Sequence, residues 1–134
     1  MSGLTGTWES EKVHGFESVV DQFGVDCEMR KLLLTANPTY TYTPLGDDGM
    51  KVRVDSEIRN AEVSFKFGEE IDEKTVLGTV CKSMYRKVSD NEIVNTQRHP
   101  EGIIEIDHKV DGNKLLMTVC VADKKCCRTF HRKQ

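Results

Sequence analysis

The sequence lacks several features that mark particular classes of protein. It has only 3 prolines among 134 residues and no low-complexity stretch, so we expect one domain over residues 1–134. No apolar run approaches the roughly 20 residues of a membrane-spanning helix, and MSGLTGTWESEK at the N-terminus has no signal-peptide core. A net charge of −3 favours neither nucleic acid nor an anionic membrane as a partner. These absences predict a soluble cytoplasmic protein.

The cysteines fit neither a disulfide framework nor a metal site. Five cysteines cannot all pair within one chain, and without an export signal we expect reduced thiols. Cys126 and Cys127 are adjacent, so in a strand they point to opposite faces and cannot readily share one ion with His131. A reactive thiol at Cys126 or Cys27 has no adjacent histidine base and no CxxC partner. We therefore expect no metal, no cofactor and no catalytic residue.

Short runs with period-two alternation dominate the chain. Residues 50–58, 61–67, 104–109 and 114–121 each place apolar side chains on one face and more polar ones on the other. This alternation predicts strands with one dry and one wet face. Residues 80–87 also alternate, but their composition leaves the inward face open. Turn-forming triplets at 47–49, 89–91, 111–113 and 122–124 predict an antiparallel meander of hairpins.

One segment follows a helical period instead. From Phe16 to Phe23 the apolar residues recur at helical spacing, Gly24 interrupts, and the spacing resumes from Val25 to Leu33. Two short helices joined at Gly24 are the prediction for residues 15–34. An all-β meander with one helical hairpin near its start indicates a closed barrel with a cap, and closure would remove sheet edges that could aggregate.

The C-terminal run KKCCRTFHRKQ reads as a final strand with an unusual cation. In residues 125–133, Arg128 shares a face with Cys126, Phe130 and Arg132. If this face meets solvent, the strand is an ordinary basic edge. If the face is interior, Arg128 is a buried cation that needs a partner or water, and a ligand carboxylate can be that partner. The pattern alone leaves both readings open.

Several short motifs stand in a specific order along the chain. They are GTW (6–8), GFE (15–17), FGV (23–25), NPT (37–39), SFKFGEEIDEKT (64–75) and C-x-R-x-F (126–130). Over essentially the whole chain this series resembles the intracellular lipid-binding proteins, and is most similar to their fatty-acid-binding members. The resemblance implies an all-β fold, a ten-stranded antiparallel up-and-down β-barrel capped by a two-helix lid with a lipid cavity inside. It also implies non-catalytic cytoplasmic binding and transport of long-chain fatty acids or similar hydrophobic carboxylates.

The resemblance also assigns a headgroup site, in which this sequence departs from the family twice. The inward Arg128 would hold the carboxylate, but Phe130 stands where fatty-acid binders carry tyrosine. The family's second arginine falls on His108, or on Asp107 if a gap is placed in residues 111–113; we prefer His108 because that register keeps the apolar residues inside. Tyr40 would supply a hydroxyl in place of the missing one, or would donate to a backbone carbonyl.

A titratable histidine in this position leads to a hypothesis about pH. We expect acidification to strengthen headgroup binding through His108 as long as the ligand stays ionised. The alternative is a neutral histidine bonded to cavity water. By the same resemblance Ser56, Asn95 and Gln97 take inward positions and would order water around the headgroup.

By the same resemblance, further residues line the cavity and the portal under the lid. They are Phe16, Val20, Val25, Met29, Pro38, Ser56, Ile58, Val76, Leu77, Gln97 and Met117. Arg30 and Lys31 would make transient contact with membranes. A retinoid or another amphiphile is the alternative cargo, and a barrel that docks on membranes is the alternative function. We expect a monomer that binds no nucleic acid.

Overall fold

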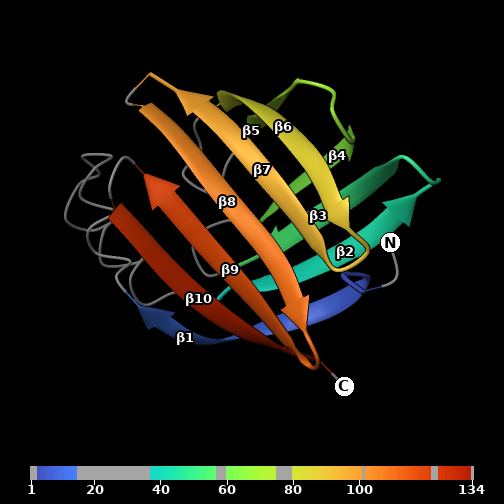
Figure 1. The fold of residues 1–134 in the computed structure, drawn as a ribbon, viewed down its shortest axis with the longest axis vertical. Coiled ribbons are helices and arrows are strands. Elements are labelled where there is room, and N and C mark those ends of the chain that lie inside the picture. The colour runs from blue at the N-terminus through green and yellow to red at the C-terminus, as the bar shows by residue number, and fades with distance from the viewer. Residues whose placement is uncertain are drawn as a thin grey trace.

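The computed structural model describes residues 3–14, 37–56, 60–74, 80–100, 102–121 and 124–133. These residues form ten strands in one antiparallel sheet (Figure 1). The strands are β1 (Gly6–His14), β2 (Thr39–Leu45), β3 (Gly49–Asp55), β4 (Ala61–Lys66), β5 (Ile71–Lys74), β6 (Val80–Ser89), β7 (Glu92–His99), β8 (Gly102–Asp111), β9 (Lys114–Val121) and β10 (Lys124–Arg132).

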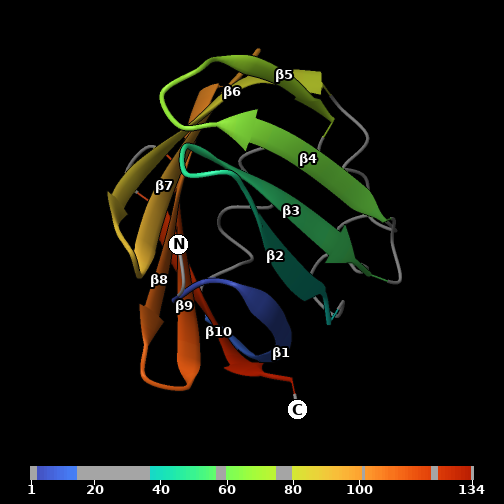
Figure 2. The same cartoon turned by 90° about the vertical axis from the view of Figure 1, so that its right-hand side faces the viewer.

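The sheet curls into a nearly closed barrel. Its order is β4-β3-β2-β1-β10-β9-β8-β7-β6-β5, so consecutive strands pair and β10 returns to pair with β1. β4 and β5 stand at the two ends of this order and come into contact without forming a ladder (Figure 2). The predicted ten-stranded antiparallel up-and-down barrel is confirmed. The predicted helical lid falls on residues outside the described part of the chain.

The period-two patterns determine which side chains face the interior. In β9, Leu115, Met117 and Val121 are buried, while Lys114 at the start of the strand is exposed and the intervening Leu116, Thr118 and Cys120 are only half-buried. In β8, the buried His108 and the half-buried Asp107 settle the register in favour of His108 as the inward residue. The inward faces predicted for both strands are confirmed.

The structure also decides the inward face of β6. Cys81, Ser83 and Tyr85 are buried there, whereas Lys82 and Arg86 are exposed. The sequence left this choice open because each face mixes apolar and polar residues. Lys82 forms an ion pair with Asp72 of β5 on the outer surface, which is consistent with its place on the wet face.

Three of the four predicted turn signals, at 47–49, 89–91 and 111–113, lie at the junctions between consecutive strands, and residues 122–123 of the fourth lie outside the described part of the chain. Gly46 after β2 and Gly112 after β8 have φ values of 70° and 62°, which favour glycine. The turn between β4 and β5 carries no predicted signal, yet Gly68 there has a φ of 80°. Its amide donates to the carbonyl of Tyr85 at 2.8 Å, so this turn is tied to β6.

Residues 3–8 pack against the end of β10. Leu4 and Trp8 are fully buried, and the Trp8 indole N–H donates to the Leu4 carbonyl at 3.0 Å. Arg132, at the end of β10, lies over the Trp8 ring at 4.1 Å from the centroid. Its guanidinium also donates to the carbonyls of Thr5 and Gly3 at 2.8 and 3.1 Å. These contacts join the first strand to the last.

In the part of the chain that the structure describes, no helix has the length and apolar character needed to cross a membrane.

Candidate functional site

β10 carries Arg128 into the barrel. The side chain is 9% exposed, and the neighbouring inward residues on its strand, Cys126 and Phe130, are buried. Arg128 pairs in register with Met117 of β9, which in turn pairs with His108 of β8. The three residues therefore lie side by side at one level of the inner wall. The interior reading of the C-terminal strand is the one the structure supports.

His108 reaches across the interior to a tyrosine that the sequence did not indicate. Its Nδ1 lies 2.7 Å from the Tyr42 hydroxyl, a contact between β8 and β2, which are not neighbours in the sheet. Among the described residues, Nε2 of His108 has no hydrogen-bond partner although it is buried. Burial lowers the pKa of His108 to about 4, because a charged imidazolium would lose its hydration there. The ligand-free site therefore holds a neutral histidine at pH 7.

Aromatic rings surround this level of the interior. Tyr40 meets Phe130 edge to face at 5.3 Å between centroids, and it contacts Tyr42 and His108 at 6.2 and 6.4 Å. Burial raises the pKa of Tyr40 to about 12, although the nearby Arg128 cation opposes the rise. Phe130 is fully buried and offers only apolar surface.

A second group of polar side chains lies on the inner faces of β5, β6 and β7. Ser83 and Tyr85 donate to Oε1 of Glu73 at 2.9 and 2.8 Å. Asn95 donates to the Ser83 hydroxyl at 2.7 Å, and Gln97 donates to the Asn95 side-chain oxygen at 2.8 Å. We call these five residues the Glu73 network. Asn95 and Gln97 are thus bonded into this network, whereas the sequence placed them near the headgroup.

The predicted cavity residues divide into described and undescribed sets. Pro38, Gln97 and Met117 are buried, and Ser56 is half-buried. The predicted residues Phe16, Val20, Val25, Met29, Ile58, Val76 and Leu77 lie outside the described part of the chain, as do Arg30 and Lys31.

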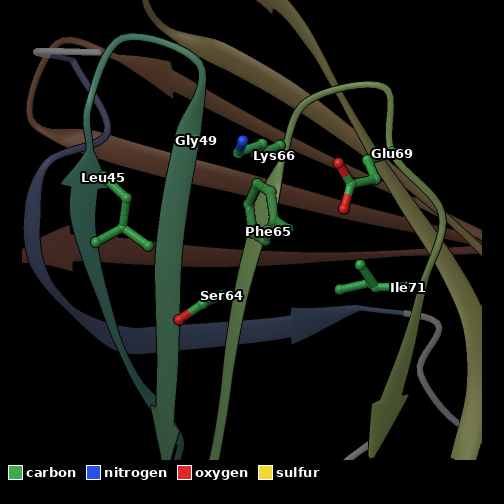
Figure 3. Close-up of a pocket in the computed structure, with 7 residues that line it drawn as sticks. All are labelled: Leu45, Gly49, Ser64, Phe65, Lys66, Glu69 and Ile71. Atoms are coloured by element: carbon green, nitrogen blue, oxygen red, sulfur yellow. The ribbon is translucent and has the colours of Figure 1, made fainter.

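A pocket of about 260 Å³ opens where the two ends of the sheet meet. Figure 3 shows its lining, which comes from the ends of β2 and β3, from β4, and from the turn into β5. The lining residues are Leu45, Gly49, Ser64, Phe65, Lys66, Glu69 and Ile71. The residues predicted for the headgroup line a different region, so this pocket is a feature of the seam between β4 and β5.

The described thiols and carboxylates form no metal centre. No group of three or more His, Cys, Asp or Glu side chains among the described residues could hold an ion. Burial raises the pKa of Cys126 to about 11, against the opposing effect of Arg128. A thiol with a raised pKa carries little thiolate at neutral pH, which disfavours a reactive thiol at Cys126; Cys27 lies outside the described part of the chain.

Tyr42, Glu73, Ser83 and Tyr85 are the polar interior residues that the sequence analysis missed. Tyr42 shares a face with Tyr40 two positions earlier, so alternation alone could have indicated it. Glu73 alternates inward with Ile71, but β5 has only four residues and gives a weak periodic signal.

Fold and interior together define a class: an antiparallel ten-stranded barrel with polar groups buried inside. No protein-family model matches the chain. The 14 kDa fatty acid-binding protein of Schistosoma mansoni is 36% identical over 132 residues, which cover 98% of each chain. Cellular retinoic acid-binding protein 2 of Rattus norvegicus is 30% identical over 98% of this chain and 99% of its own.

A solved structure agrees with these relatives. The Schistosoma mansoni fatty acid binding protein in complex with arachidonic acid superposes with a TM-score of 0.96 at 36% identity, covering 100% of this chain and 98% of that chain. The chain belongs to the fatty-acid-binding protein family, a group of intracellular lipid-binding proteins.

Proposed function

We propose that the protein, acting as a single domain over residues 1–134, binds a long-chain fatty acid inside the barrel and carries it through the cytoplasm. It does so without catalysis and as a monomer. The observation that supports this most is the inward Arg128, buried at one level with His108 in a barrel whose close structural neighbour holds arachidonic acid.

In this proposal Arg128 provides the charged anchor. A guanidinium donates to a carboxylate with matched, two-pronged geometry, and the buried setting strengthens each hydrogen bond. Tyr40 lies beside it with its phenol protonated, because its pKa is about 12. His108 adds a donor when its Nε2 carries the proton, and a carboxylate ligand favours that tautomer because Nδ1 can then accept from Tyr42.

The tail provides most of the affinity. Burying a sixteen-carbon chain contributes about 0.8 kcal/mol per methylene, on the order of 10 kcal/mol before costs. One hydrogen bond to a charged group contributes about 1.5–3 kcal/mol net. The anchor therefore selects and orients the acid, while the apolar wall holds it. With Phe130 and His108 in place of tyrosine and a second arginine, this selection rests mainly on Arg128.

The first experiment compares a fatty acid with its methyl ester, which keeps the tail and removes the charge. In calorimetric titrations of delipidated protein, we expect oleate to bind roughly 10- to 100-fold more tightly than methyl oleate. In Arg128→Gln this preference should disappear, mainly through weaker binding of the acid. Arg98→Gln on the exposed face of β7 is the matched control and should keep the preference.

Two results would overturn the anchor. Equal binding of acid and ester by the unaltered protein would make the barrel an apolar container without a charged site. An acid preference that survives in Arg128→Gln would assign the carboxylate to another residue. Circular dichroism of each variant verifies the fold before titration.

A retinoid is the second candidate cargo, supported by the identity to a protein named cellular retinoic acid-binding protein 2. Both cargoes end in a carboxylate, so the anchor does not separate them. Displacement of a fluorescent fatty acid by oleate and by retinoic acid ranks the two directly. Transient contact of Arg30 and Lys31 with membranes also belongs to the proposal, and sedimentation with anionic liposomes tests it together with the alternative of a membrane-docking barrel.

A further inference from the structure

Glu73 places a carboxylate on the inner wall of the barrel, away from the proposed anchor. Along β5, Ile71 and Glu73 are half-buried, while Asp72 and Lys74 are exposed. Arg128 lowers the pKa of Tyr40 and Glu73 raises it, so the cation and the carboxylate both act on the same interior. Burying a carboxylate costs desolvation free energy unless hydrogen-bond donors satisfy it, so we expect donors around Glu73.

The hydrogen bonds between members of the Glu73 network all run toward this carboxylate. Gln97 donates to Asn95, Asn95 donates to Ser83, and Ser83 donates to Oε1 of Glu73. Tyr85 donates to the same oxygen. Hydrogen bonds that run in one direction polarise one another. Burial raises the pKa of Glu73, and the two hydrogen bonds that end on it oppose this rise because they favour the ionised form.

The network is held in place before any ligand arrives. The Tyr85 ring stacks on Phe65 with 3.7 Å between centroids and 5° between planes. Asn95 and Ser83 are each 1% exposed, and Asn95 also donates to the backbone carbonyl of Met84 at 3.1 Å. A group that binds here therefore meets a carboxylate whose position is already fixed.

One oxygen of Glu73 remains available. Both hydrogen bonds from described residues end on Oε1, which leaves Oε2 without a donor in the described part of the chain. An ionised carboxylate oxygen accepts hydrogen bonds and cannot donate them. A ligand hydroxyl complements Oε2, whereas a ligand ketone would place a second acceptor against it.

We propose that Oε2 of Glu73 is a second recognition site inside the barrel, which accepts a hydrogen bond from a hydroxyl on the tail of a hydroxylated fatty acid. The inference rests on the proposed function, because the carboxylate of the same ligand is assigned to Arg128. It adds a substrate class: fatty acids that carry a donor along the tail.

The test uses stearate, a positional series of hydroxystearates from mid-chain to the tail end, and the matching oxostearates. Hydroxyl and ketone differ little in size but are opposite in donor capacity. At one position or more, we expect the unaltered protein to bind the hydroxy acid about ten-fold more tightly than the oxo acid. Equal binding of every hydroxy and oxo pair overturns the proposal.

Glu73→Gln sharpens the test because an amide N–H₂ can take the place of Oε2 and donate to a ketone. In this variant the preference for the hydroxy acid should shrink to near unity or reverse. Glu105→Gln, the same chemical change on the exposed face of β8, should retain the original preference. A preference that persists unchanged in Glu73→Gln assigns the hydroxyl to another group and overturns the proposal.

The parent acid separates this inference from the proposed function. If stearate binds but no hydroxy and oxo pair is distinguished, only the Glu73 site fails. If stearate itself does not bind, the proposed carrier function fails, and the Glu73 site as a fatty-acid subsite fails with it. The preference for hydroxy over oxo acids is also measured in the unaltered protein. The proposal can therefore be refuted even if Glu73→Gln does not fold.

Discussion

His108 is a histidine that the fold keeps neutral. Burial lowers its pKa from 6.5 to about 4, so between these values the unfolded chain binds a proton that the ligand-free folded protein does not. The free energy of unfolding should therefore fall as pH falls from 6.5 to 4, by about 3 kcal/mol from this residue. Urea unfolding of delipidated protein across this range measures the fall.

The matched variants isolate His108 from the other titrating groups. His108→Gln keeps a side chain that can bond to Tyr42 but removes the titration, so its stability should decline less between pH 6.5 and 4. His131→Gln, on the opposite face of β10, should follow the unaltered protein. A decline of the same size in His108→Gln would show that other groups carry the acid sensitivity.

Single residues also show what the sequence could and could not predict. Alternation grouped Arg128 with Cys126 and Phe130 on one face of the last strand, but only the family resemblance turned that face inward. For His108, the register that keeps Ile104 and Ile106 inside gave the inward position. The Tyr42–His108 contact joins residues 66 positions apart on strands that do not pair, so no local pattern predicts it. The direction of the Glu73 network likewise depends on side chains from three strands, and only the assembled barrel brings them together.

Among the strands, β5 differs from the rest in length and in pairing. It has four residues, pairs only with β6, and turns its other edge toward β4 without a ladder. Backbone amides on that edge should exchange with solvent deuterium faster than the amides of β8 and β9, which are paired on both sides. The free energy of the opening that exposes them should be lower by about 2 kcal/mol or more.

Native-state hydrogen exchange followed by NMR tests this ordering. The β5 amides bonded to β6 serve as the internal comparison, because they share the strand but not the unpaired edge. Protection of the free edge equal to that of β8 would mean that β4 and β5 are bonded in solution.

The length of strands also limited the prediction of elements. The eight-residue β9 and ten-residue β8 gave periodic patterns that the structure confirms. The short β5 was read only as part of a family motif. In β6, tertiary burial decided a face that composition could not, because Ser83 is inward through its bond to Glu73 and not through apolar character.

For the molecule as a whole, Arg132 links the two ends of the chain. It donates to the carbonyls of Gly3 and Thr5 and covers Trp8. Arg132→Ala removes all these contacts and should lower the free energy of unfolding by about 2–4 kcal/mol. Arg132→Lys should recover only part, because an ammonium group lacks the planar fork that bonds two carbonyls at once.

Lys133→Ala is the control, since Lys133 is exposed at the next position. Its free energy of unfolding in urea should stay close to that of the unaltered protein. If Arg132→Ala were equally mild, the termini would be joined by the β1–β10 ladder alone.

Nine antiparallel ladders join the ten described strands, and the seam between β4 and β5 has none, so the barrel wall is interrupted along one line. Among the described strands, separation of β4 from β5 would break no backbone ladder. The backbone amides of Phe67 and Gly68, in the turn that joins the two strands, donate to the carbonyls of Asp48 and Tyr85 and restrain this separation. We therefore expect the barrel to accommodate straight, bent or branched ligands by a change of width at this seam, while Arg128 and His108, on strands that are paired on both sides, keep their positions.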